Sequence, residues 1–212
     1  MKKIVGAVML VLALSAAESQ AATIGSLPAN NDVIPGTEGI FGANLYLIAG
    51  PLGALIDIEF VGFEAGYTNE FFLNGTSYIV NQSTATGPVA TVNVLPGLIN
   101  FHFTVNSGAA SVTNGTNVLP NGITPNFFVS LAPGPSNAER DTTVDGVTPF
   151  FGQTAWLALD DAGAGPDDNH DDLVLKLTIS GGTFQVPDGG ATLTLLGCAL
   201  IGLGAVRRRF GA

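Results

Sequence analysis

The stretch Leu98–Val105 reads Leu-Ile-Asn-Phe-His-Phe-Thr-Val, and its pattern indicates the fold class of the whole chain. Apolar and polar side chains alternate along it, which is the period of a β-strand, because successive strand side chains point to opposite faces. The apolar face carries Ile99, Phe101, Phe103 and Val105. The stretch therefore predicts a strand with one buried face and one polar face.

Similar apolar, β-rich runs recur along the chain, with turn signals between them. We expect strands at Ile56–Phe60, Phe71–Leu73, Thr76–Val80, Val89–Leu95, Asn126–Leu131, Thr154–Leu159 and Leu173–Ser180. Asn74-Gly75 is a strong hairpin signal, and a second turn is expected at Asn114-Gly115. We expect the pairs Phe127-Phe128 and Phe150-Phe151 in the core. Without helical periodicity or a fixed repeat, the pattern predicts an all-β protein, an antiparallel β-sandwich that is jelly-roll-like.

The N-terminus has the composition of a secretory signal. Lys2 and Lys3 precede the uncharged apolar segment 4–14, and Ser19-Gln20-Ala21 places small residues at a cleavage site. We therefore expect residues 1–21 to be a signal peptide with its own helix, and residues 22–185 to be one exported domain. An uncleaved N-terminal helix is the alternative.

The C-terminus combines a break in regular structure, an apolar run and a basic end. Pro187 and Gly189-Gly190 interrupt the chain, and residues 191–206 contain no charged residue. The run has 16 residues, which is short beside the ~20 that a spanning helix usually needs. Three arginines follow, and such residues stay on the cytoplasmic side. The order predicts a transmembrane helix at 191–206 that anchors weakly.

This tail resembles the PEP-CTERM class of sorting tails, in the variant that begins Val-Pro-Asp. The matching residues are Val186, Pro187, Asp188, Gly189, Gly190, Arg207, Arg208 and Arg209, around the apolar run. Gly189 stands where the variant more often carries Ser. The resemblance implies a Gram-negative precursor held in the inner membrane with its domain in the periplasm. An exosortase, an integral-membrane peptidase or transpeptidase, would then deliver it to the cell surface or outside. A simple anchor is the alternative.

The charge balance limits the partners of the exported domain. Two basic residues, Arg140 and Lys176, stand against fifteen acids, which gives a net charge near −13. Nucleic acid is excluded, because phosphate binding needs clustered Lys and Arg.

The chain's one cysteine, Cys198, lies in the tail, so no disulfide braces the domain. The segment 74–137 is free of charged residues, and we expect it to present a surface of Asn, Thr, Ser and Gly.

The most chemically distinctive segment is the acidic loop 160–172, which holds six carboxylates in thirteen residues between two expected strands. Crowded carboxylates disperse into water, shift their pKa values or hold a cation. Calcium accepts six to eight oxygen ligands in flexible geometry. The candidate ligands are Asp160, Asp161, Asp167, Asn169, Asp171 and Asp172. A solvated acidic turn is the alternative. Zinc is disfavoured, because it prefers His and Cys ligands and His170 stands alone here.

The spacing of the acidic loop does not match an EF-hand, because Asp172 replaces its turn glycine and Thr178 its bidentate Glu. Residues 156–177 resemble instead the C-terminal motif of a DUF4114-type domain of exported PEP-CTERM proteins. The matching features are Asp160-Asp161, Gly163, Gly165 and the run 167–172. The run departs from that motif at Asn169, His170 and Asp171. The resemblance implies calcium as a cofactor.

The sequence favours a non-catalytic protein of the cell surface or the exopolysaccharide-associated extracellular matrix. No nucleophile elbow, phosphate loop or zinc-protease motif is present in the sequence. A carbohydrate-binding module is the runner-up, with Trp156, Tyr46, Tyr67 and Tyr78 as candidate platforms. A hydrolase that uses two carboxylates ranks lower, and its candidate acids are Asp57, Glu59, Glu64 and Glu70. Asp57 and Glu59 alternate with apolar residues along one expected strand, so we expect them on its outer face rather than in a catalytic cleft.

Overall fold

The computed structural model describes residues 22–28, 31–131, 151–162 and 169–187. Within these residues the chain forms fifteen β-strands and no helix, and every strand pair is antiparallel. The predicted all-β antiparallel architecture is confirmed. The expected signal helix and transmembrane helix fall in the segments 1–21 and 188–212, which are not described. In the part of the chain that the structure does describe, no helix could span a bilayer.

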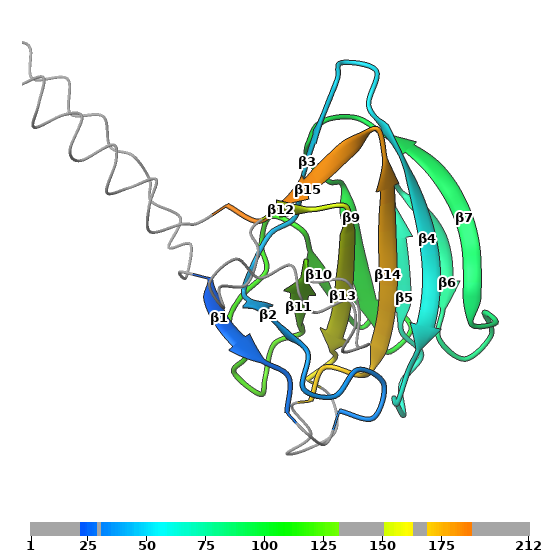
Figure 1. Cartoon of the computed structure of the whole chain (residues 1–212). Coiled ribbons are helices and arrows are strands. Elements are labelled where there is room, and N and C mark those ends of the chain that lie inside the picture. Colours follow the sequence, from blue (N-terminus) through cyan, green and yellow to red (C-terminus); the bar gives the residue numbers. More distant parts are fainter. Residues whose placement is uncertain (1–21, 29–30, 132–150, 163–168, 188–212) are drawn as a thin grey trace, which may run out of the picture.

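Three sheets make up the fold (Figure 1). The seven-stranded sheet has the order β1 (Thr23–Ser26), β2 (Glu38–Phe41), β11 (Asn126–Ser130), β13 (Thr154–Asp160), β14 (Leu173–Ser180), β4 (Ala54–Gly62) and β7 (Gly87–Val94). A second sheet has the order β10 (Ala110–Thr113), β9 (Phe101–Val105), β5 (Glu70–Leu73) and β6 (Thr76–Val80). The third has the order β12 (Phe151–Gly152), β15 (Gly182–Gln185), β3 (Tyr46–Ala49) and β8 (Gly97–Leu98).

One hydrophobic core joins the three sheets. Phe127 of β11 meets Phe101 and Phe103 of β9, with ring centroids 5.2 and 5.8 Å apart, so the large sheet faces the second sheet directly. Leu47 of β3 and Phe184 of β15 belong to the same buried cluster. Aromatic rings each bury a large area, so these contacts contribute much of the hydrophobic stabilisation.

The far side of the large sheet is also covered in part. Phe128, Trp156 and Val174 form a second buried cluster with Leu27 and Ile34 of the N-terminal segment. The connection between β1 and β2 therefore packs over β11, β13 and β14. Strands buried on both faces read as continuous apolar runs rather than alternating ones, which explains the sequence Asn-Phe-Phe-Val-Ser of β11.

Most of the expected strands form, but the opening stretch 98–105 divides. Gly97 and Leu98 belong to the third sheet, and β9 begins only at Phe101. Between them, the Ile99 N–H bonds to the Leu45 carbonyl and the Ile99 carbonyl accepts from Asn114 Nδ2 at 2.8 Å. The chain therefore crosses from one sheet to another at Ile99–Asn100. The predicted apolar face remains correct, since all four of its side chains are buried.

One other expectation was wrong, and a second, the exposed surface of Asn, Thr, Ser and Gly over residues 74–137, was correct for most of the segment but not for all of its Asn residues. Phe151 is 54% exposed, because β12 is a two-residue edge strand and Phe151 lies on its outer side; Phe150 is not among the described residues. The Asn residues of the uncharged segment 74–137 are not simply a polar coat, because several are buried as hydrogen-bonding groups within the fold. The buried ones are Asn81, Asn114, Asn117 and Asn126.

Candidate functional site

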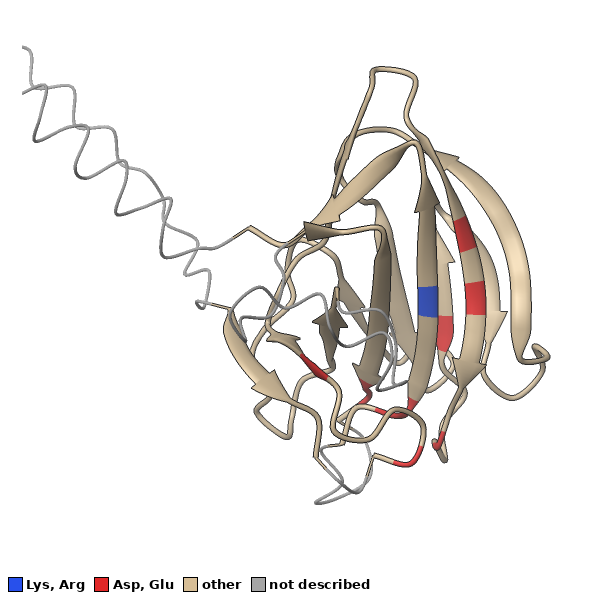
Figure 2. Ribbon diagram, viewed as in Figure 1, with Lys and Arg blue, Asp and Glu red and all other residues tan. Residues whose placement is uncertain are grey.

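The acidic loop joins the two central strands of the large sheet. β13 ends at Asp160, and Asp172 directly precedes β14, which pairs with β13 from Leu173 onward. Figure 2 shows acidic residues gathered at this end of the sheet, on loops that come from several parts of the chain. The alternation of the strands stops here because consecutive Asp residues favour turns over strands.

Asp160 is held by its surroundings from two directions. It is 1% exposed, and its Oδ1 accepts a hydrogen bond from the Ala162 N–H at 2.7 Å. Its Oδ2 accepts from Asn126 Nδ2 at 2.9 Å. Asn126 in turn lies 2.7 Å, through its Oδ1, from Nε2 of His170, whose ring meets the edge of Phe41. This chain of contacts links the ends of β11 and β13 to the loop before β14.

Asp161 and Asp172 connect the same loop to the second sheet. Asn69, which is fully buried just before β5, donates from Nδ2 to Asp161 Oδ2 at 2.8 Å. The Asp161 N–H donates to Asp172 Oδ2 at 2.8 Å. Asn81 lies behind them, and its Oδ1 accepts from the Asn69 N–H at 3.1 Å. Buried amides that reach both a carboxylate and the backbone fix the relative position of the two layers.

The N-terminal segment is attached at the same place. Asp171 is fully buried, its Oδ2 accepts from the Asp32 N–H at 3.1 Å, and its carbonyl accepts from the Glu64 N–H at 2.8 Å. Asn31 donates from Nδ2 to the Asn169 carbonyl at 2.7 Å. Loops from three regions far apart in sequence thus meet the acidic loop.

The carboxylates around Asp172 interact strongly. The pKa of Asp172 is raised from 3.8 to about 8, chiefly by burial and in addition by the negative charges of Asp161, Asp160 and Asp171. The hydrogen bond from the Asp161 backbone opposes that rise in pKa. Asp172 therefore holds its proton at neutral pH while no cation is present, since its neutral form avoids both desolvation and like-charge repulsion.

The structure brings together four of the six predicted calcium ligands, Asp160, Asp161, Asp171 and Asp172, and it also places Asn169 nearby. Asp167 and Asp168 belong to the segment 163–168, which is not described. Among the described residues, no three His, Cys, Asp or Glu side chains are arranged to hold a metal ion. The carboxylates that are described accept hydrogen bonds from amides instead, so without residues 163–168 this donor set does not fit calcium.

The sequence analysis missed the amides that support the acidic loop. Asn31, Asn69, Asn81 and Asn126 lie outside the loop and far from one another in the chain. One signal was available for Asn126, which directly precedes the fully apolar run Phe127–Val129 and so had to enter the interior with that run. The other three are apparent only once the loops are placed in space.

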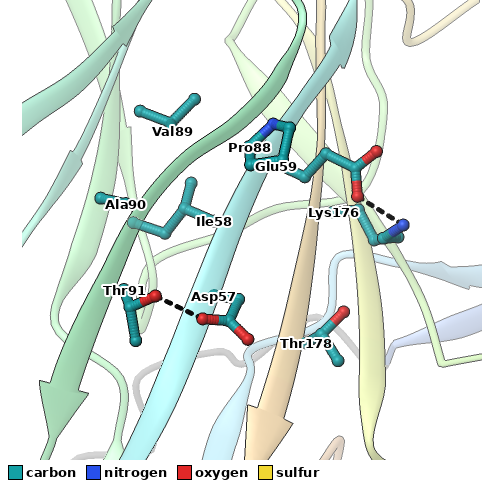
Figure 3. A pocket seen from close by; sticks show the side chains of 9 residues that line it. All are labelled: Asp57, Ile58, Glu59, Pro88, Val89, Ala90, Thr91, Lys176 and Thr178. Carbon is teal, nitrogen blue, oxygen red and sulfur yellow. Dashed lines mark hydrogen bonds and ion pairs between the residues drawn. The ribbon is translucent and has the colours of Figure 1, made fainter.

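A separate groove lies on the outer face of the large sheet (Figure 3). It measures about 510 Å³ and lies over β4, β7 and β14. Thr91 donates to Asp57 at 2.5 Å, and Lys176 pairs with Glu59 at 2.5 Å. Asp57 and Glu59 therefore lie on the outer face, as the alternation predicted, and each already has a partner there. Lys176 also lies 5.6 Å from the ring centre of Trp156.

The candidate aromatic platforms are only partly available. Trp156 is 7% exposed and belongs to the second buried cluster. Tyr46, Tyr67 and Tyr78 are half-buried. The side chain with the largest stacking surface is therefore used for packing.

The C-terminal end of the described fold leads directly into the tail. β15 ends at Gln185, and the buried Val186 belongs to the main core. The family model described as the VPDSG-CTERM motif matches residues 185–210. Residues 185–210 are a sorting tail of the PEP-CTERM type. The match contains the predicted motif 186–190, the apolar run and the three arginines, and it begins at the last residue of β15.

The PEP-CTERM-type tail indicates a secreted protein that an exosortase-type membrane enzyme sorts and processes, and it fits an exported precursor anchored in the membrane. The match does not extend to residues 156–177, so the DUF4114-type resemblance stays a prediction. No curated protein and no solved structure matches this chain.

Proposed function

We propose that this chain is a non-catalytic protein of the cell surface or the exopolysaccharide-associated extracellular matrix, released from the inner membrane by an exosortase. The sorting tail carries this proposal, because it directly follows the last strand of the folded domain. The seven-stranded sheet packs against the second sheet around one core, and we assign this arrangement to a β-sandwich with jelly-roll-like connectivity.

The polar groups of the described surface support a non-catalytic role. Of the candidate acids for a hydrolase, Asp57 bonds to Thr91 and Glu59 is paired with Lys176. His102 stacks on Phe72, with ring centroids 4.6 Å apart. These side chains stabilise the strands on which they lie.

Fractionation of a strain that produces an exosortase tests the proposal. We expect the full chain in the matrix fraction, and a chain truncated after Gln185 in the periplasm or the medium. In the matched control, Arg207, Arg208 and Arg209 are changed to Gln while the apolar run 191–206 is kept. This variant separates the contribution of the three arginines from that of the apolar run. Retention of the full chain in the inner membrane of exosortase-positive cells would contradict the proposal.

We propose calcium as a cofactor of the mature protein, bound by the acidic loop 160–172. The grouping of Asp160, Asp161, Asp171 and Asp172 supports this, because the charges of the other three add to the effect of burial in raising the pKa of Asp172, and a divalent cation would offset that repulsion. Asp167, which lies outside the described residues, would have to supply a further ligand. A ligand that binds only the folded state stabilises it by ~2.7 kcal/mol at a hundredfold excess over Kd.

The calcium proposal is tested by thermal melting of the chain in calcium and in chelator. We expect calcium to raise the melting temperature, and the Asp167→Ala, Asp171→Ala double variant to lose this rise. Because Asp171 also bonds to Asp32 and Glu64, the single Asp167→Ala variant serves as the structurally mild control. An unchanged melting temperature at millimolar calcium would show that the loop is a structural turn.

A carbohydrate-binding module is the second candidate, and the groove of Figure 3 favours it. The groove has a volume of about 510 Å³, and Asp57, Thr91 and Lys176 are among its lining residues. Their side chains offer the hydrogen-bond acceptors and donors that sugar hydroxyl groups need. Titration calorimetry with soluble exopolysaccharide fragments tests it. Binding that disappears in Asp57→Ala would support this module, and heats equal to dilution would exclude it.

A further inference from the structure

The third sheet, formed by β12, β15, β3 and β8, has an uncharged outer face on which exposed apolar side chains lie beside Gln185 and Thr183. Its register places Phe151 opposite Gln185, Gln185 opposite Tyr46, and Tyr46 opposite Leu98, so these four side chains form one row across all four strands. Phe151 is 54% exposed and Leu98 43%. Ile48, on the same side of β3, is 46% exposed.

The opposite side of this sheet is already used by the core. Leu47 and Phe184, which alternate with the outer row, are buried in the main cluster. The outer row is therefore a second apolar face, which the described residues leave in contact with solvent. Of the nine exposed large apolar side chains in the described chain, five lie in these strands or within three residues of them. The five are Ile48, Leu52, Leu95, Leu98 and Phe151.

The same sheet is free of charge. None of the residues in β12, β15, β3 and β8 is Asp, Glu, Lys or Arg. Figure 2, compared with the labels of Figure 1, shows the acidic residues on β2, β4 and β5 and at the end of the molecule that carries the acidic loop. In a domain with a net charge near −13, a neutral apolar face is the one that an anionic membrane surface would repel least.

In an anchored precursor, the chain length keeps the end of β15 close to the membrane. Pro187 is the last described residue, and the uncharged apolar run starts at Ala191, so only residues 188–190 separate them. Three residues span at most about 10 Å. The four strands of the third sheet, at about 4.8 Å spacing, are about 15 Å wide. Because the connection is no longer than the sheet is wide, the third sheet lies within reach of the lipid headgroups when the tail is inserted.

We propose that the outer face of the third sheet rests on the bilayer surface while the precursor is anchored. The side chains Phe151, Tyr46, Leu98 and Ile48 enter the boundary between headgroups and acyl chains, and the acidic loop points away from the lipid. Aromatic and aliphatic residues are the groups that bind this boundary. The contact holds the segment 186–190 in a fixed position near the membrane, where the exosortase acts. This inference rests on the anchored precursor of the proposed function.

Fluorescence quenching of the full chain in vesicles tests the proposal. The vesicles contain phosphatidylcholine and phosphatidylglycerol, with nitroxide-labelled lipids, at less than one chain per vesicle so that a second copy cannot cover the face. A fluorophore is attached at position 48 (Ile48→Cys, Cys198→Ser). The matched control is position 83 (Ser83→Cys, Cys198→Ser), in the β6–β7 connection, which lies on the far side of the molecule from β3 and β15 in Figure 1. The native Cys198, labelled alone, reports insertion of the tail.

We expect headgroup nitroxides to quench the label at position 48 more strongly than the label at position 83. Each half-exposed side chain that enters the boundary favours the docked state by about fivefold. The Leu98→Ser, Phe151→Ser double variant should therefore reduce the docked-to-undocked ratio by about 25-fold. Both side chains are at the surface, so the fold should persist.

Two results would overturn the proposal, and they are distinguishable. Equal quenching at positions 48 and 83, with Cys198 quenched by acyl-chain nitroxides, would leave the anchor intact and exclude docking of this face. A Cys198 label that is not quenched would show that the tail does not insert, and both the anchored precursor and the docked face would fail.

Discussion

Asn126 connects three elements at the acidic loop, and its removal should destabilise the fold. The change Asn126→Ala deletes the donor to Asp160 Oδ2 at 2.9 Å and the partner of His170 Nε2 at 2.7 Å. Asn126, Asp160 and His170 are each at most 1% exposed, so water does not readily replace the lost contacts. A hydrogen bond to a buried charged group contributes ~2 kcal/mol and a neutral one ~1 kcal/mol, which sums to ~3 kcal/mol.

The matched control is Asn121→Ala. Asn121 is exposed, and its Oδ1 accepts from the N–H groups of Ile123 and Thr124 in a local turn. Its loss should cost ~1 kcal/mol or less, because water can replace those contacts.

Thermal melting of both variants in chelator compares their losses of unfolding free energy. For a domain of this size ~1 kcal/mol corresponds to ~3 °C, so Asn126→Ala should melt ~9 °C below the wild type and Asn121→Ala ~3 °C below it. Equal melting temperatures for the two variants would refute the claim that the buried amides hold the acidic loop in place.

Three further predictions follow from single contacts. The folded pKa of Asp172, about 8, lies above its unfolded value of 3.8, so the folded state keeps an extra proton between them. In chelator, the urea midpoint should therefore be highest below about pH 4 and fall as the pH rises towards 8, and Asp172→Asn should flatten this slope. Gly53→Ala should destabilise by ~2 kcal/mol or more, because φ is +82° and the new Cβ would lie 2.2 Å from the Val94 carbonyl oxygen, whereas Gly50→Ala meets nothing within 4 Å. Lys176→Met should change the unfolding free energy by ~1 kcal/mol or less, because its ion pair with Glu59 is partly exposed, and a larger loss in urea titration would count against this.

The central strands could be predicted because each carries its own signal. Alternation in β9 and β14, and the Asn74-Gly75 turn, whose φ values are +52° and +78°, depend only on neighbours in the chain. The short strands β1, β2, β3, β10, β12 and β15 were missed, because two to four residues are too few to show a period.

The candidate site was predicted only in part, for a similar reason. The crowding of Asp160, Asp161, Asp171 and Asp172 is a local property of the sequence, and these residues do come together. Asn69 and Asn126 reach them from 92 and 34 residues away, and only the sheet order places them there. Phe151 was misassigned to the core because apolarity alone does not distinguish the inner face of an edge strand from its outer face.

The intact mass of the chain from the matrix fraction of exosortase-positive cells, compared with that from exosortase-deficient cells, tests the central claim most directly. The account predicts that the matrix form lacks the apolar run and the arginines of the tail, and that deficient cells keep the tail-bearing precursor in the inner membrane. A matrix form that still carries residues 191–212, or the same mass and location in both strains, would contradict sorting through the tail.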